Sequence, residues 1–301
     1  MFPDRVLAAM RARLSGALAR PKGHYRPLWV ERAVTGWLDG TRAARLAEMA
    51  DVFDVRDDGL SFVAGIHGVR DRSVALDRVA RVLAAEGLLT AWRDERYAVA
   101  PEFGAPPWYE LERAAARFFG IRTYAAHVNG LVRRNGEIAM WIARRSPAKS
   151  IDPGLLDNLV GGGVAAGQSV ASTVVKEAQE EAGMAAGFAA LAQSAGSVHI
   201  CREQPDGVQR ETIFVHDLWL PVDFAPAGQD GEVVEHRLVP LRDVGPLIAN
   251  AEGPDVVTAD AALVMLDCLV RNGAIAPDAP AYGALEALRH PPDFLLSSRG
   301  T

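Results

Sequence analysis

The chain has 301 residues, of which 49% are hydrophobic and 23% are charged, as in an ordinary globular protein. Its formal net charge is −6, so broad electrostatic binding to nucleic acid or to anionic lipid is not expected. With two cysteines, a disulfide framework and a thiolate metal cluster are excluded, and no apolar stretch approaches the roughly 20 residues of a membrane-spanning helix. We expect a cytoplasmic protein with neither nucleic acid nor membrane as partner.

The first part of the chain alternates helical and extended patterns. Apolar spacing and end signals predict helices over residues 1–20, 41–50, 73–86 and 108–119. Two runs with strand character lie between them, at residues 60–68 and 92–99. Ser73 is the predicted N-cap of the third helix. Together these elements predict a small α/β domain over residues 1–118.

The second part has longer strands. Residues 123–132 and 138–143 are β-like runs joined by Arg133-Arg134-Asn135-Gly136, and an Asn-Gly pair between apolar runs is typical of a hairpin. Further elements are expected as strands over 155–160, 211–220 and 233–238, and as helices over 169–182 and 258–271. The tail after Pro277 is rich in proline and small residues, so we expect it to be peripheral. We predict a second α/β domain over residues 119–301.

The segment from Gly162 to Met184, GGVAAGQSVASTVVKEAQEEAGM, carries the strongest chemical signal. On a helical wheel, three glutamates fall in a narrow arc beside the apolar stripe, while Lys176 points elsewhere. Like charges four residues apart destabilise a helix by ~0.2–0.5 kcal/mol, and the helix dipole disfavours negative charge near the C-terminus. A divalent cation, Mg²⁺ or Mn²⁺, would resolve this conflict. The alternative is three solvated carboxylates.

This segment also resembles a Nudix box, whose pattern is G-x5-E-x7-R-E-U-x-E-E-x-G-U, where U is a bulky aliphatic residue. At the family's spacing, its positions are occupied by Gly162, Glu177, Glu180, Glu181, Gly183 and Met184. Gln168 and Lys176 replace the pattern's first glutamate and its arginine, which help to hold the loop and helix together in the family. The resemblance implies a Nudix α/β/α sandwich with a mixed sheet, and hydrolysis of a diphosphate linked to another moiety. It also implies that the three glutamates hold the metal together with the Gly162 carbonyl.

A wider resemblance covers nearly the whole chain. Its motifs include WRDERYAV from Trp92, HVNG from His127, ARRS from Ala143 and DGEV from Asp230. In this order they resemble the Nudix subgroup related to the C-terminal half of fungal thiamine pyrophosphokinase, which carries its own N-terminal companion domain. The resemblance implies that damaged, oxidised thiamine diphosphates are hydrolysed to the monophosphate and phosphate.

Candidate substrate-binding residues lie outside the box. His127 and Asn129 begin the first strand of the Nudix part and are candidates for substrate contact, with a core role as the alternative. Arg145 and Lys149 are candidates for clamping the phosphates, against the alternative of a solvated basic turn.

The catalytic candidates are the three glutamates of the box, Glu177, Glu180 and Glu181, together with Glu232. Glu181 could activate water or act only as a metal ligand. Glu232 lies just before a predicted strand, where several Nudix enzymes place an additional functional carboxylate. The alternative for Glu232 is a solvated loop residue.

Other interpretations of the glycine run are weaker. A dinucleotide fingerprint needs an acidic residue at the end of a second strand about 20 positions on, where this chain is still helical. A phosphate-binding P-loop needs a lysine that Gly167-Gln168-Ser169 lacks. A broader nucleoside or sugar diphosphate pyrophosphatase and a catalytically weak ligand sensor with the same fold stay open, as does a homodimer.

Overall fold

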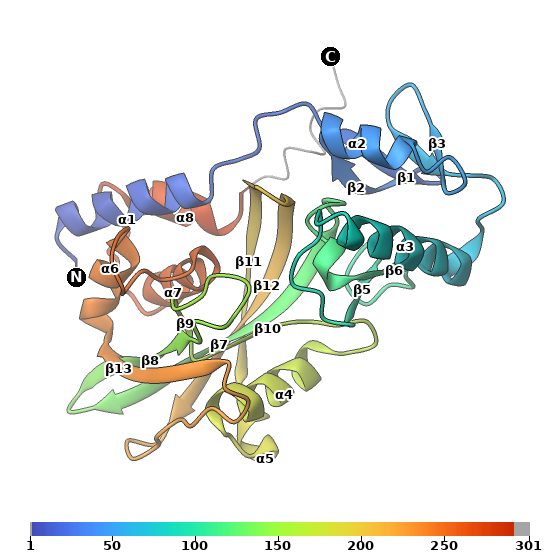
Figure 1. Ribbon diagram of the computed structural model, residues 1–301. Coiled ribbons are helices and arrows are strands. Elements are labelled where there is room, and N and C mark those ends of the chain that lie inside the picture. The colour runs from blue at the N-terminus through green and yellow to red at the C-terminus, as the bar shows by residue number, and fades with distance from the viewer. Residues whose placement is uncertain (1, 292–301) are drawn as a thin grey trace.

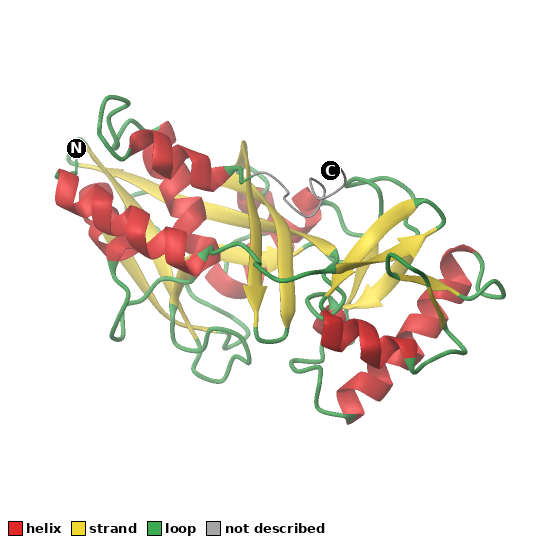
Figure 2. Cartoon of the chain, turned by 90° about the horizontal axis from the view of Figure 1, so that it is seen from above, coloured by secondary structure: helices red, strands yellow, loops and turns green. Residues whose placement is uncertain are grey.

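The computed structural model describes residues 2–291 and shows two bodies lying side by side (Figures 1 and 2). The larger body is built on a seven-stranded mixed sheet, and the smaller one on a four-stranded sheet with a two-stranded ribbon beside it. Both combine helices and strands, which confirms the predicted α/β class. Within the described residues, no helix combines the length and the apolar character needed to span a bilayer.

The larger sheet runs in the order β11-β12-β7-β8-β13, with β10 paired to β7 and β9 paired to β8. Its strands are β7 (Arg122–Arg134), β8 (Glu137–Arg145), β9 (Leu156–Asn158), β10 (Val160–Gly163), β11 (Gln193–Gln204), β12 (Gly207–Leu220) and β13 (Val233–Pro240). Asn135 and Gly136 have φ of 51° and 80° and close the β7–β8 hairpin as predicted. β12 runs parallel to β7, so the two strands end at the same edge.

Helices cover both faces of this sheet (Figure 1). One face carries α4 (Val170–Ala182) and α5 (Ala186–Ala189). The other carries α1 (Asp4–Ala17), α6 (Leu241–Ala249), α7 (Ala259–Arg271) and α8 (Tyr282–Arg289). The division into domains 1–118 and 119–301 stays a prediction. In the structure α1, from the first of these ranges, packs within the larger body.

The smaller body has its own hydrophobic core. Its elements are β1 (Arg26–Val30), β2 (Ala33–Leu38), α2 (Gly40–Ala47), β3 (Phe53–Val55), β4 (Leu60–Phe62), α3 (Gly68–Ala85), β5 (Arg96–Val99) and β6 (Tyr109–Glu112). Leu46 of α2 and Leu76 and Leu83 of α3 are fully buried against the sheet, which runs in the order β2-β1-β4-β3. The 41–50 helix is confirmed, and the 60–68 and 92–99 strands are confirmed in shorter form.

Two local predictions in the smaller body are wrong. Residues 108–119 form β6 and a single 3-10 turn instead of a helix, because Tyr109 to Glu112 pair with Val99 to Arg96. Ser73 lies inside α3 rather than at its cap: its hydroxyl donates to the Val69 carbonyl at 2.7 Å and accepts from the Glu110 N–H at 2.8 Å. In both cases long-range hydrogen bonds override the local signal.

The larger body also differs from prediction in two places. β11 has no clear signal in the sequence, yet it pairs with β12 along its length. The tail after Pro277 is not wholly peripheral, because α8 packs on the core and Leu285 is fully buried. The part of the tail from residue 292 lies outside the described residues.

The two bodies meet through backbone hydrogen bonds. The Val208 N–H of β12 donates to the Arg117 carbonyl at 2.9 Å. The Ala166 N–H, just after β10, donates to the Arg96 carbonyl of β5 at 2.7 Å. These bonds fix β5 of the smaller body beside the glycine run of the larger one.

Candidate active site

The glycine run of β10 lies where three side chains from different elements converge. A Cβ added to Gly162 would lie 2.6 Å from a carboxylate oxygen of Glu177, and one on Gly163 would lie 2.2 Å from the Tyr97 hydroxyl. A Cβ on Gly161 would lie 2.9 Å from the His127 ring. Glycine therefore allows α4, β5 and β7 to approach the same backbone.

Helix α4 presents the three glutamates along one edge. Ser169 and Ser172 form a capping box at its start, and Gly183 ends it in the left-handed conformation with φ of 66°. The side chains of Glu181, Glu177 and Glu180 are 6%, 14% and 40% exposed. The glutamates thus lie beside the buried stripe, as the wheel predicts.

Glu181 is the most deeply buried of the three. One of its oxygens accepts the Gly161 N–H at 2.8 Å, and the other lies 3.8 Å from the Lys149 ammonium. Burial raises the pKa of Glu181 to about 8, although Lys149 acts in the opposite direction. A carboxylate at this depth has few partners and would be stabilised by a further cation.

Lys176 contacts the other two glutamates. Its ammonium lies 3.0 Å from a carboxylate oxygen of Glu177 and 3.0 Å from one of Glu180. This corrects the wheel, which directs the residue elsewhere: the four-carbon side chain reaches back to its neighbours. Burial raises the pKa of Glu177 despite the lysine.

Lys149 and Glu232 form an ion pair at the rim of the site. Arg93 of the smaller body lies 3.3 Å from the other Glu232 oxygen, and the Ser146 N–H donates to the Glu232 carbonyl at 2.7 Å. Burial would raise the pKa of Glu232, but Lys149 and Arg93 together hold it below its ordinary value. Glu232 is therefore an anion shared by cations from both bodies.

Arg145 faces the same space. Its guanidinium lies 2.7 Å from Asp157 and donates to the Ile151 carbonyl at 2.9 Å and the Asp152 carbonyl at 3.1 Å. Arg144 points elsewhere, binding Glu235 and several groups of the 254–255 loop.

The two candidates on β7 have different surroundings. His127 lines the cavity, and its Nδ1 lies 2.8 Å from the Asn158 amide oxygen. Asn129 is fully buried, donates to Asp217 at 3.0 Å and accepts from Asn158 at 3.3 Å. Asn129 therefore has a core position instead of the substrate contact predicted for it. Its hydrogen bond with Asn158 links it to His127.

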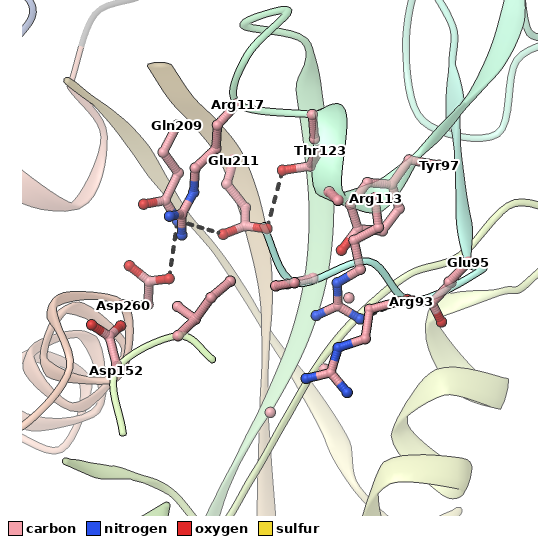
Figure 3. Close-up of a pocket in the computed structure, with 18 of the residues that line it drawn as sticks. Arg93, Glu95, Tyr97, Arg113, Arg117, Thr123, Asp152, Gln209, Glu211 and Asp260 are labelled. Carbon is pink, nitrogen blue, oxygen red and sulfur yellow. Dashed lines mark hydrogen bonds and ion pairs between the residues drawn. The ribbon is translucent and has the colours of Figure 1, made fainter. Parts of the chain in front are cut away.

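A cavity of about 360 Å³ connects these groups and lies between the two bodies. Figure 3 shows side chains from both bodies facing it. From the larger body it is lined by His127, Arg145, Lys149, Gly161, Gly162, Gly163, Glu177, Glu180 and Glu232, among others. The smaller body contributes Arg93, Glu95 and Tyr97, all from the WRDERYAV motif. The motif marks these residues as part of the family resemblance in the sequence. Their position beside the Nudix box could be found only from the tertiary structure.

Both parts of the chain match known protein families. Residues 122–261 match the NUDIX domain model, and residues 8–123 match DUF4743, a domain of unknown function. The chain is 35% identical over 269 residues to Nudix hydrolase 20, chloroplastic, of Arabidopsis thaliana, covering 86% of this chain and 71% of the relative. This chain belongs to the Nudix hydrolase family.

A second relative of this Nudix hydrolase is Nudix hydrolase 24, chloroplastic, of the same plant, at 36% identity over 262 residues with the same coverage of both chains. Among solved structures, DR0079 from Deinococcus radiodurans is 24% identical with a TM-score of 0.40, covering 59% of this chain and 98% of that one. The family membership and the relatives identify the protein as a Nudix pyrophosphatase.

Nudix hydrolases generally use divalent metals such as Mg²⁺. Among residues 2–291, no three His, Cys, Asp or Glu side chains are already grouped as a metal site. Lys176 lies against Glu177 and Glu180, and Lys149 lies 3.8 Å from Glu181. The donor set nevertheless fits a hard cation: carboxylates on one helix edge face a glycine whose Cβ would occupy the same space. The buried Glu181, with its raised pKa, also favours an added positive charge.

Proposed function

We propose that this Nudix hydrolase uses Mg²⁺ or Mn²⁺ to cleave oxidised thiamine diphosphates to the monophosphate and phosphate. The observation that carries the hydrolytic part is the buried, under-compensated Glu181, whose partners Gly161 and Lys149 line a cavity together with Glu177 and further cationic side chains. The thiamine part is supported by the order of the four motifs that begin at Trp92, His127, Ala143 and Asp230.

In this proposal Glu177, Glu180, Glu181 and the Gly162 carbonyl hold the cation. When bound, the metal polarises phosphoryl oxygens, lowers the pKa of water and neutralises charge on the leaving phosphate. Lys176 gives up its contacts with Glu177 and Glu180 and remains close to the metal-binding edge as a positive charge for the phosphates.

The cations around Glu232 bind the diphosphate. Lys149 and Arg93 already share this carboxylate, and Arg145 lines the same cavity. A diphosphate that attracts Lys149 and Arg93 leaves an oxygen of Glu232 free to accept a proton from the attacking water. His127, oriented through Asn158 and Asn129, borders the glycine run on the substrate side.

The expected partner is a small-molecule diphosphate. Solved Nudix relatives include one complexed with ADP-ribose and one described as an Ap4A hydrolase, so the family takes several such ligands. A homodimer stays a prediction. A cytoplasmic location stays one too, and both plant relatives are named chloroplastic.

The test is Mg²⁺-dependent phosphate release from a panel of diphosphates. The panel contains oxothiamine, oxythiamine and thiamine diphosphates, ADP-ribose, and nucleoside di- and triphosphates. We expect the oxidised thiamines to be preferred, and turnover to be lost in a Glu180→Gln, Glu181→Gln variant but kept in Gln179→Ala, which changes an exposed residue of the same helix. Turnover of ADP-ribose or nucleotides alone would replace the thiamine assignment with the broader pyrophosphatase. No metal-dependent turnover would favour the sensor.

A further inference from the structure

The cavity has a second end, away from α4, with a different character. Gln209 and Glu211 of β12 and Asp260 of α7 line it together with Asp152. Figure 3 shows this group across the cavity from Arg93, Arg113 and Tyr97 of the smaller body. One end of the cavity thus combines the glutamates of α4 with cations. The other end presents the acceptors Asp152, Glu211 and Asp260 together with Arg117, whose guanidinium is paired with Asp206.

Glu211 is the central acceptor of this second end. One of its oxygens accepts from the Thr123 hydroxyl at 3.1 Å, and the other accepts from the Gln209 amide at 2.9 Å. Gln209 also donates to Asp260 at 3.0 Å and accepts from Arg202, so its amide is fully used. Each carboxylate oxygen has two lone pairs, and one on each oxygen of Glu211 is left for a ligand.

The charge of Glu211 lacks a direct counter-ion. Most other cavity carboxylates are ion-paired, for example Asp157 with Arg145 at 2.7 Å and Asp206 with Arg117 at 3.4 Å. Among the residues that the structure describes, Asp152 shares with Glu211 the lack of an ion pair. Within residues 2–291, Glu211 forms no ion pair and is held by neutral donors. Burial, and then Asp260, raise its pKa. A ligand that donates hydrogen bonds would stabilise this carboxylate.

Tyr97 gives an independent sign of a ligand between the two ends. It is only 6% exposed, and its hydroxyl lies against Gly163. Arg113 covers its ring at 5.7 Å, but its hydroxyl makes no hydrogen bond to any residue that the structure describes. Buried tyrosine hydroxyls normally have a partner, so this one is available to a molecule in the cavity.

We propose that the Glu211 end binds the organic group of the substrate, and that this group is a nitrogen heterocycle bearing an amino group or a ring N–H. Glu211 accepts the N–H hydrogen bond, and the Tyr97 hydroxyl contacts the same ligand nearer the glycine run. The inference rests on the proposed function only in placing the diphosphate at the α4 end. It adds the chemical class of the group at the other end and the residue that selects it.

Two pairs of probes that differ by one amino group test this proposal. The pairs are thiamine diphosphate with its 4′-deamino analogue, and ADP with purine riboside 5′-diphosphate. Dissociation constants are measured by calorimetry without divalent cations, so that turnover does not interfere and the residues of α4 stay unchanged. The cavity residue is changed by Glu211→Met, which removes the acceptor, and by the milder Glu211→Gln. Asp206→Asn is the control, because Asp206 lines the same cavity but is already paired with Arg117.

We expect the amino form of at least one pair to bind about tenfold more tightly, a difference of about 1.4 kcal/mol. That preference should disappear in Glu211→Met, shrink in Glu211→Gln and persist in Asp206→Asn, while the deamino probe binds all four proteins alike. Equal binding within both pairs, no binding of either amino form, or a preference unaffected by Glu211→Met would overturn the proposal. Failure of the proposed hydrolysis is seen separately, as absence of phosphate release by the unmodified chain from probes that it binds.

Discussion

Two buried carboxylates of the larger body have contrasting surroundings. Asp267 of α7 is 1% exposed and accepts from Arg271 at 2.6 Å and from Arg289 at 2.9 Å. Glu181 of α4 is 5% exposed, but it has one backbone N–H and a lysine at 3.8 Å. Both lie on helices that pack on the same sheet, on opposite faces.

The difference separates a charge that the fold compensates from one that it leaves short of partners. Asp267 belongs to a network that continues through Arg271 and Asp217 to Asn129, so its charge is compensated within the chain. Glu181 is not compensated to the same degree, and its partners Gly161 and Lys149 line the cavity. A buried charge that the fold leaves short of partners is one that a bound cation can stabilise.

The largest effect on activity is expected at Glu180 and Glu181, where we propose that a bound cation compensates the negative charge. In Glu180→Gln, Glu181→Gln, Mg²⁺-dependent phosphate release should fall by at least about 10³-fold, or ~4 kcal/mol of transition-state stabilisation. The melting temperature should not fall, because the buried and poorly compensated charge of Glu181 is removed and the exposed Glu180–Lys176 pair contributes little. Steady-state kinetics and calorimetry check both points. Retention of more than a tenth of the activity would contradict the metal-binding roles.

At the compensated carboxylate the effect should be on folding. Asp267→Asn leaves Arg271 and Arg289 without their buried anionic partner, so the free energy of unfolding should fall by about 3 kcal/mol. Urea unfolding at pH 7 measures this, with the exposed Asp278→Asn as control, expected to change by less than about 0.5 kcal/mol. Protein that stays folded should keep its kcat. If the variant were stable but inactive, Asp267 would have a role in activity and the structural role proposed for it would be wrong.

The glycine run tests how closely α4 must approach. Gly162→Ala would place a Cβ 2.6 Å from a carboxylate oxygen of Glu177 and displace that side chain. We expect kcat to fall by about 10²-fold, since a shift of about 1 Å in a catalytic group costs this much. Gly187→Ala in α5 is the control, because a Cβ there meets nothing within 4 Å. Equal activity of both variants would show that Glu177 needs no fixed position.

The smallest effect belongs to an exposed charge. Arg237 and Arg144 lower the pKa of Glu235 from 4.5 to about 2. A carboxylate with a lowered pKa stabilises the fold above pH 4.5 and loses that contribution as the pH falls towards 2. At pH 7 the native chain should melt no more than about 2 °C above Glu235→Gln, because exposed pairs contribute ~0–1 kcal/mol. Thermal scans from pH 7 to pH 2 should show the difference vanish, and an unchanged difference at pH 2 would contradict the assignment.

Much of the fold could be predicted because its signals are local. The Asn135-Gly136 hairpin, the capped helix α4 and the helix that starts after Thr258 depend on backbone preferences of a few neighbouring residues. The helix predicted over 108–119 is wrong, and β11 is not predicted. Both segments are strands because they pair with residues outside the local segment.

The candidate site divides in the same way. Helical periodicity and motif spacing alone determine that Glu177, Glu180 and Glu181 share one edge and follow a glycine-rich loop. Only the tertiary structure decides that Asn129 is buried behind His127 and that Glu211 lies at the far end of the cavity. It also decides that, from the smaller body, Arg93 reaches Glu232 and Tyr97 reaches the glycine run. The physical reason is that periodicity acts within one helix, whereas these contacts depend on how two bodies and two faces of a sheet pack against each other.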